Sequence, residues 1–291
     1  MDNIAILGYG NIGKAAEQAL CTATDMTLAG IYHHSEISLL LDHCRQGKVQ
    51  AVLLCTPTRE VPEYAEQLLA TGVCTADSFD IHGQIADLRR RLMPLAQRHQ
   101  SVSVVSAGWD PGSDSVVRTL MQALAPQGVT YTDFGPGRSM GHTVAAKAID
   151  GVADALSMTI PLGTGLHRRM VYVQLLEGAD FDEVKARLLA DDYFAHDETH
   201  VIQVPDVQVL NNVAHGVHLS RNGVSGNTHN QRMEFTMTIN NPALTGQMLV
   251  ASIRAALRLK REERYGAYTM IEIPPIYYLE GEDEVNIRKL V

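Results

Sequence analysis

The chain has 291 residues, of which 45% are hydrophobic and 20% are charged, as is usual for a globular protein of one or two domains. Its 24 basic and 33 acidic residues leave a net charge of −9, which argues against nucleic acid or an anionic membrane as a partner. No apolar run is long enough for a membrane span, and the start of the chain does not resemble a signal peptide. Four cysteines without C-x-x-C spacing favour a reduced, cytoplasmic protein.

The first part of the chain alternates short apolar runs with helix-compatible segments. Strands are predicted at 3–7, 26–32, 51–56, 73–79 and 101–107, and helical segments at 14–23, 36–47, 60–72 and 84–99. This alternation is typical of βαβ units around a parallel sheet. The first 115 residues are therefore predicted to form a doubly wound, Rossmann-like α/β domain.

The pattern changes after residue 125. Strand-like segments follow at 128–137, 154–161, 168–176, 200–210, 216–223 and 231–239, with helices near 143–148 and 180–191. This predicts an α+β domain on a mostly antiparallel or mixed sheet. The helical period returns from residue 241, and a long helix there is expected to pack on the first domain. We therefore expect a discontinuous dinucleotide-binding domain of residues 1–120 and 243–291, and a second domain of 121–242.

A glycine-rich loop follows the first predicted strand. Gly8, Gly10 and Gly13 form G-x-G-x-x-G between a strand and a helix, which is the phosphate loop of dinucleotide-binding folds. The helix N-terminus would offer unpaired N–H groups to the pyrophosphate. The alternative is a fold that kept the glycines without the cofactor.

The end of the second predicted strand distinguishes NAD from NADP in such folds, because NAD binders usually place an acid there. This chain has His33, His34 and Ser35, and Glu36 lies beyond them. Imidazole and hydroxyl groups could hold a 2′-phosphate. An exposed polar turn is the alternative interpretation.

Five motifs in order along nearly the whole chain resemble meso-diaminopimelate dehydrogenases. They are GYGNIG at 8–13, SFDIH at 78–82, GWDPG at 108–112, GPGRSMGH at 135–142 and HGVH at 215–218. The resemblance implies oxidative deamination of the D-configured carbon of meso-2,6-diaminopimelate. The products would be L-2-amino-6-oxopimelate, ammonia and NADPH, within lysine biosynthesis.

The resemblance also implies roles for individual residues. Asp110 and Asp80 would be catalytic and hold the D-centre amine, with Asp80 at the end of the fourth strand. Asp110 could instead cap an Asp-Pro turn, and Asp80 could be a helix N-cap. Substrate contacts are expected from Asp80, Trp109, Asp110, Phe134, Met140, Gly141, Thr159, Arg169, His215 and Asn241. Cofactor contacts are expected from Gly8, Tyr9, Gly10, Asn11, Ile12, Gly13, His33, His34, Ser35, Cys55, Thr56, Thr58, Asp80, His82, Pro111 and Gly112.

Arg169 would pair with the distal carboxylate, since a guanidinium matches a carboxylate in a bidentate fork. Met140 could equally be a packing residue. His215 on its own would pass for a surface histidine. The second domain would bind substrate and form a homodimer.

Two departures from the family pattern concern the cofactor and the pocket rim. The family commonly has Arg-Arg at the positions of His34 and Ser35, so NADP is expected with NAD also possible. The segment between Thr159 and Arg169 is shorter than in many members, and Phe134 stands where the family often has Trp.

Other functions fit these motifs less well. HDETH at 196–200 lacks the H-E-x-x-H pattern of zinc proteases, and His215 and His218 have no cysteine partner, so no metal is expected. A related reductase of amino or imino acids, or a protein that senses dinucleotides without turnover, are the alternatives.

Overall fold

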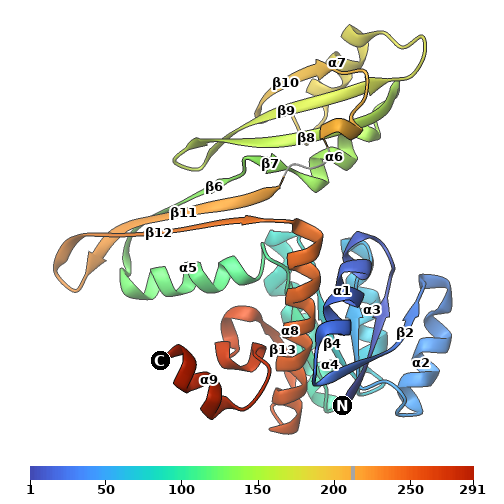
Figure 1. The fold of residues 1–291 in the computed structure, drawn as a ribbon, viewed down its shortest axis with the longest axis vertical. Helices are drawn as coiled ribbons and strands as arrows, with labels where there is room; N and C mark the ends of the chain where they lie inside the picture. The colour runs from blue at the N-terminus through green and yellow to red at the C-terminus, as the bar shows by residue number, and fades with distance from the viewer. Residues whose placement is uncertain (211–213) are drawn as a thin grey trace. The chain divides into compact units, whose positions relative to one another are not determined.

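The computed structural model describes residues 1–210 and 214–291, and the chain divides into two compact units (Figure 1). The first unit consists of Met1–Thr119 and Asn241–Val291, and the second of Leu120–Asn240. Among the described residues, no helix has both the length and the apolar character needed to cross a membrane.

The first unit is built on a six-stranded sheet whose pairings are all parallel, in the order β13-β5-β4-β3-β1-β2. The strands are β1 Asp2–Leu7, β2 Met26–Tyr32, β3 Ala51–Leu54, β4 Cys74–Asp77, β5 Val102–Val105 and β13 Gly266–Thr269. The helices are α1 Asn11–Thr22, α2 Ile37–Arg45, α3 Val61–Leu69, α4 Ile85–Arg98, α8 Asn241–Arg261 and α9 Asp283–Leu290, and α5 Ser113–Leu124 begins in this unit. Because β2 and β3 lie on opposite sides of β1, the chain reverses its winding direction there, which is where such sheets bind ligands.

Both faces of this sheet are covered, as the apolar strands require. Ile4 and Ile6 of β1 pack into a core shared with α1 and α8, whereas Ala5 and Leu7 face a second core formed with α2, α3 and α4. The two-residue alternation of a strand explains this division. The Rossmann-like fold predicted from the sequence is confirmed.

The helix α8 returns to the first unit and lies against α1 (Figure 1). A Cβ at Gly246 would come within 2.6 Å of the backbone nitrogen of Ala16. Glycine is therefore required at this position for the two helices to approach so closely.

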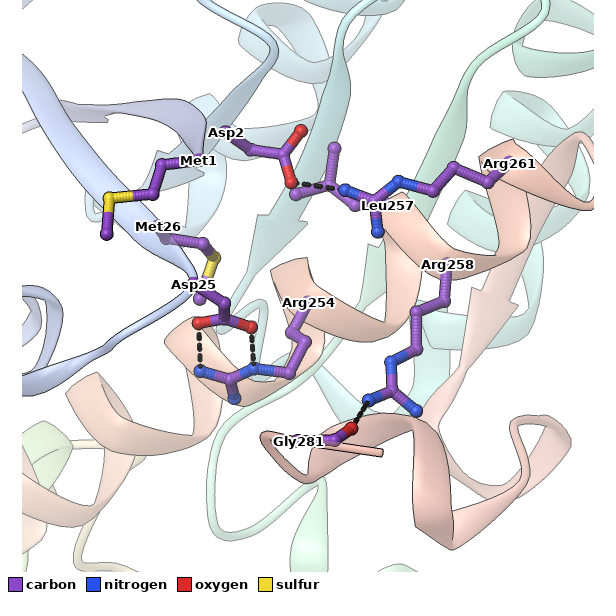
Figure 2. A pocket seen from close by; sticks show the side chains of 9 residues that line it. All are labelled: Met1, Asp2, Asp25, Met26, Arg254, Leu257, Arg258, Arg261 and Gly281. Atoms are coloured by element: carbon purple, nitrogen blue, oxygen red, sulfur yellow. Dashed lines mark hydrogen bonds and ion pairs between the residues drawn. The ribbon is translucent and has the colours of Figure 1, made fainter. Parts of the chain in front are cut away.

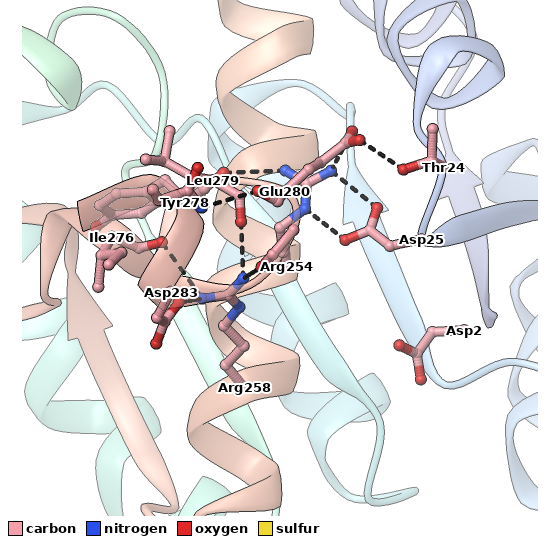
Figure 3. Close-up of polar contacts among 12 residues, drawn as sticks. Asp2, Thr24, Asp25, Arg254, Arg258, Ile276, Tyr278, Leu279, Glu280 and Asp283 are labelled. Carbon is pink, nitrogen blue, oxygen red and sulfur yellow. Dashed lines mark hydrogen bonds and ion pairs between the residues drawn. The ribbon is translucent and has the colours of Figure 1, made fainter. Parts of the chain in front are cut away.

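The C-terminal segment is tied to α8 by two arginines (Figure 3). Arg254, whose side chain is 5% exposed, donates to both carboxylate oxygens of Asp25, at 2.6 and 3.0 Å, and to Glu280 at 2.9 Å. Arg258 donates to Asp283 at 2.8 Å and to backbone carbonyls including that of Leu279. These contacts join the loop before β2, α8 and the segment that follows residue 275.

The second unit contains two sheets. The mixed sheet has the order β10-β9-β8-β7, with β10 parallel to β9, and the antiparallel sheet has the order β12-β11-β6. The elements are β6 Gln127–Phe134, β7 Gly137–Arg138, α6 Met140–Lys147, β8 Val152–Gly163, β9 Leu166–Leu175, α7 Phe181–Ala190, β10 Glu198–Gln203, β11 His215–Ser225 and β12 Thr228–Ile239. The expected α+β architecture is confirmed.

Three local predictions were wrong or incomplete. The helices α5 and α9 were not predicted, because Gly/Pro turns and short acidic stretches concealed their starts. The predicted strand 200–210 ends at Gln203, since Pro205 cannot continue a ladder.

Candidate functional site

The glycine loop joins β1 to α1 at the point where the winding reverses. Gly8 has φ +94°, and a Cβ there would lie 2.5 Å from the carbonyl oxygen of Cys55. A Cβ at Gly13 would lie 2.2 Å from the oxygen of Gly8, whereas Gly10 has no atom within 4 Å of such a position. The first and third glycines therefore close the loop, and Gly10 leaves room for a ligand to approach the backbone.

The residues next to this loop fit a dinucleotide. Thr56 follows β3, and its buried hydroxyl oxygen has no hydrogen-bond partner within the described residues. Such an atom needs a partner, and a phosphate or hydroxyl of a bound cofactor would supply one. Gly10 precedes the first turn of α1, whose N–H groups can bind an anion.

The polar turn after β2 differs from the expectation that Glu36 lies beyond the site. His33, His34 and Ser35 are exposed, but the turn folds Glu36 back so that its carboxylate accepts the N–H of His33 at 2.9 Å. An acid therefore does lie at the end of β2. The short 3-10 turn over His34–Glu36 brings the carboxylate of Glu36 back to the end of β2, although Glu36 lies four residues beyond that end in the sequence.

The expectation that Asp80 ends the fourth strand was wrong. β4 ends at Asp77, and Asp80 is exposed in the following loop, where its N–H donates to the hydroxyl of Thr58 at 3.0 Å. Asp80 is not the N-cap of α4, which is Gln84. His82 is also exposed, in the short turn that precedes α4.

Asp77, which sequence reasoning missed, is fully buried. Its Oδ1 accepts the N–H groups of Phe79 and Ser106, both at 3.0 Å, and its Oδ2 has no partner within the described residues. Burial raises the pKa of Asp77 to about 6, against the lowering effect of the two backbone hydrogen bonds. Through these two hydrogen bonds, Asp77 links the loops after β4 and β5. The backbone of Ser106 in the second loop is strained, with φ +57°.

The turn after β5 presents Trp109 and Asp110. A Cβ at Gly112, where φ is +147°, would lie 1.9 Å from the oxygen of Gly108, so the turn requires glycine. The Trp109 oxygen accepts the N–H of Asp114 at 3.1 Å, which leads the turn directly into α5. Trp109 is 5% exposed, so the indole is packed inside the turn rather than fully open to solvent.

Asp110 has two charged neighbours on α5. Arg118 lies 3.5 Å from its carboxylate and 2.6 Å from that of Asp114, whose side chain is fully buried. Burial and the nearby charge of Asp110 raise the pKa of Asp114 to about 8, although Arg118 opposes this. The turn thus holds two carboxyl groups beside one guanidinium, a setting suited to binding and releasing protons.

In the second unit, β8 and β9 place Thr159 opposite Arg169. The guanidinium of Arg169 donates to the Thr159 hydroxyl and, through Nε, to Asp197 at 2.6 Å. Arg168, the next residue along β9, pairs with Glu198 at 2.8 Å. These two arginines are adjacent in β9, and side chains alternate along a strand, so they face opposite sides of the sheet.

Other predicted substrate residues of the second unit lie near this sheet or on the neighbouring one. The Phe134 N–H donates to Nε2 of His167 at 2.7 Å, and the two rings lie 5.7 Å apart. The backbones of Gly137 and His215 approach closely, since a Cβ added at Gly137 would lie only 2.5 Å from the Cα of His215. Met140 and Gly141 are exposed and lie in the first turn of helix α6 rather than in a loop.

Two remaining predictions concern Asn241 and the histidine-rich HDETH segment. Asn241 is the first residue of α8, in the first unit, and its side-chain oxygen accepts the hydroxyl of Thr245 at 3.1 Å. In HDETH, β10 begins at Glu198, and His200 pairs with Glu198 at 2.9 Å. Within the part of the chain that the structure describes, no three His, Cys, Asp or Glu side chains are grouped as a metal site.

A cavity of about 400 Å³ lies elsewhere in the first unit, beside the start of β1 and the residues before β2 (Figure 2). It is lined by three arginines of α8, Arg254, Arg258 and Arg261. Each of these three arginines is already paired with an acid. The cavity is at the amino ends of the strands, whereas the glycine loop follows the carboxyl end of β1, so we do not take it as the cofactor site.

Comparisons with known proteins agree along the whole chain. The family model for the diaminopimelic acid dehydrogenase C-terminal domain matches residues 108–166. The meso-diaminopimelate D-dehydrogenase of Bacteroides fragilis is 53% identical, over 99% of this chain and 98% of its own length. The structure of the C. glutamicum enzyme in complex with diaminopimelate is 26% identical with a TM-score of 0.86, covering 100% of this chain and 99% of that one.

An engineered D-amino acid dehydrogenase bound to NADP+ is similar as well, at 26% identity and a TM-score of 0.83, with 100% of this chain and 99% of that one covered. The similarity to the Bacteroides fragilis enzyme spans 99% of this chain. It therefore includes the glycine loop, the Trp109–Asp110 turn and the sheet that carries Arg169. This chain belongs to the meso-diaminopimelate D-dehydrogenase family.

Proposed function

We propose that this protein catalyses the reversible oxidative deamination of the D-centre of meso-2,6-diaminopimelate, using NADP+. The products are L-2-amino-6-oxopimelate, ammonia and NADPH. The observation that carries this proposal is 53% identity to a meso-diaminopimelate D-dehydrogenase over nearly the full length of both chains.

We assign the D-centre amine to acids of the first unit. Asp110 lies beside Arg118, and Asp80 is exposed after β4. Their carboxylates would hold the ammonium and accept its proton before the D-centre C–H bond breaks. The resulting imine is hydrolysed to the oxo acid and ammonia, and Trp109 would shield this step from solvent. Bound NADP+ would supply the acceptor for the hydride.

We assign the distal end of the substrate to residues of the second unit. Arg169 is positioned by Thr159, and its fork suits a carboxylate. His215 would add a contact of this unit, and Asn241 would add one from the first. Met140 and Gly141, also of the second unit, would contact the D-centre, and Phe134 would form a wall of the pocket. Residues 121–242 would then serve both substrate binding and dimerisation.

The cofactor would be held by the glycine loop and by the residues after the strands of the first unit. Gly8, Gly10 and Gly13 fit the pyrophosphate as described above. His33, His34 and Ser35 can donate to a 2′-phosphate. The carboxylate of Glu36 lies near the same position and would repel a second negative charge. We therefore expect NADP to be preferred with NAD also used.

If the Glu36 carboxylate opposes binding of the 2′-phosphate, Glu36→Gln should change the choice between NADP and NAD. The variant keeps the size of the side chain but removes the charge, so the kcat/KM ratio of NADP to NAD should rise about tenfold, on the scale of a single charged contact. Asp42→Asn, which removes the charge of an exposed acid of α2 that pairs with Arg45, would serve as the control. An unchanged ratio in Glu36→Gln would mean that Glu36 acts only on the backbone of His33.

The function is tested by following NADPH formation with purified protein and the isomers of diaminopimelate. Turnover is expected with the meso isomer and not with the LL isomer, which has no D-centre. Turnover with another amino acid but not with meso-diaminopimelate would favour a related reductase. No turnover with any amino acid, together with tight NADP binding, would favour a cofactor sensor.

The four cysteines are free, in keeping with a cytoplasmic enzyme.

A further inference from the structure

Arg169 lies beside an acid, Asp197, to which the proposed reaction gives no role. Its side chain is 14% exposed, its Nε donates to Asp197 at 2.6 Å, and its Nη1 donates to Thr159. Within the described residues, Nη2 makes no hydrogen bond and keeps its two N–H donors for a ligand. A positive and a negative group therefore lie side by side at one point of the sheet.

The structure around Asp197 holds it in this position. Its N–H donates to the oxygen of Phe194, which is 1% exposed in the core of the second unit. Its own backbone oxygen accepts the hydroxyl of Thr199, which pairs with Arg169 across β10 and β9. The Asp197 side chain remains 31% exposed, so a ligand can reach it.

His142 is the neighbouring group that could add a competing charge. Its ring lies against Tyr193 and Phe194, at 5.4 and 5.5 Å between centroids. Burial, together with the positive charge of Arg169, lowers the pKa of His142 to about 4. His142 is therefore neutral near pH 7 and adds no charge beside Arg169 and Asp197.

We propose that Arg169 and Asp197 together recognise an amino-acid zwitterion, with Arg169 binding its carboxylate and Asp197 its ammonium. This inference rests on the proposed function, since the distal end of meso-diaminopimelate carries both groups on one carbon. Asp197 is then a residue that determines specificity, because it attracts a distal ammonium that a substrate with only a distal carboxylate lacks.

The experiment compares two substrates that differ only in the distal amine, meso-diaminopimelate and D-2-aminopimelate. For the wild type we expect kcat/KM to favour meso-diaminopimelate about tenfold or more, the scale of one charge-assisted hydrogen bond. Asp197→Asn should lose most of this preference, through a fall with meso-diaminopimelate and little change with D-2-aminopimelate. Arg169→Met should weaken both substrates alike, since both carry the distal carboxylate.

Glu198→Gln is the matched control, because Glu198 is the next acid along the chain and pairs with Arg168 instead. It should leave the preference within about twofold of the wild type, since exposed ion pairs contribute little. Equal losses for both substrates in Asp197→Asn would overturn the inference and reduce Asp197 to a residue that positions Arg169. A preference that survives in Asp197→Asn would overturn it as well.

Calorimetric binding of the two substrates separates this inference from the proposed function. Absent turnover of meso-diaminopimelate by the wild type would count against the proposed function. Loss of the binding preference in Asp197→Asn would still support the zwitterion site, and its retention would refute it.

Discussion

At the scale of single residues, the turn after β5 places the charge of Asp110 beside Arg118 and Asp114. Asp110→Asn keeps the shape of the turn but removes the charge proposed to hold the substrate amine. We expect kcat/KM for meso-diaminopimelate to fall about 10²-fold or more, as for other positioning or acid–base groups. The Kd of NADP should change little, because the phosphates are assigned to the glycine loop.

Arg118 retains Asp114 as a partner in this variant, so the fold should persist. Loss of the Asp110 charge removes one cause of the raised pKa of Asp114, which should move downward. Near wild-type turnover, or a defect confined to NADP binding, would show that Asp110 is a turn residue.

The raised pKa of Asp77 predicts that the free energy of unfolding depends on pH. Its pKa is about 6 in the folded protein, above the value of about 4 for an unfolded aspartate, so the folded state binds the proton more tightly. This contribution to stability is present below about pH 4 and is lost as the pH rises through about 6, a change of about 3 kcal/mol. Asp77→Asn cannot titrate, but its amide oxygen can still accept from Phe79 and Ser106.

We therefore expect the free energy of unfolding of Asp77→Asn, relative to the wild type, to rise between pH 4 and 7. Denaturant titrations followed by the fluorescence of Trp109, the single tryptophan, would measure it in the same unit. Parallel pH profiles for the two proteins would mean that Asp77 remains ionised throughout and that its burial is compensated.

At the scale of elements, α8 is fastened to the loop before β2 and to the C-terminal segment by Arg254. Burial opposes ionisation of Asp25, but the hydrogen bonds and charge of Arg254 outweigh it and lower the pKa of Asp25. Arg254→Met leaves the two acids without their partner, and we expect a loss of about 3 kcal/mol in the free energy of unfolding.

Arg261→Met is a matched control on the same helix. Arg261 also pairs with an acid, Asp2, but its side chain is 61% exposed, so its loss should cost less than about 1 kcal/mol. Protease digestion should release the segment after residue 275 first in Arg254→Met. Similar losses in both variants would mean that the burial of Arg254 does not strengthen its ion pairs.

At the scale of the whole molecule, the second unit exposes large apolar side chains. They include Val129 (53% exposed), Leu162 (47%), Leu166 (64%) and Ile202 (38%). Apolar surface of this kind favours contact with a second copy. We expect sedimentation equilibrium at micromolar concentration to give twice the chain mass of 31.8 kDa, and a mass of one chain would contradict the homodimer.

The sequence by itself determined what local patterns can encode. The alternation of apolar runs and helical periods predicted the strands of the Rossmann-like sheet. G-x-G-x-x-G predicted the loop in which the backbone requires glycine at Gly8 and Gly13. The GWDPG turn also formed where it was expected, because Gly112 adopts a conformation that other residues rarely adopt.

Only the tertiary structure decided which charged groups meet. Asp77 rather than Asp80 ends β4, Glu36 folds back to His33, and Asp197 pairs with Arg169 although they are separated by 28 positions. These pairings depend on where a strand ends, on a one-turn helix and on the register between β9 and β10. The sequence contains every one of these residues, but strand register brings distant residues together, and local periodicity does not specify it.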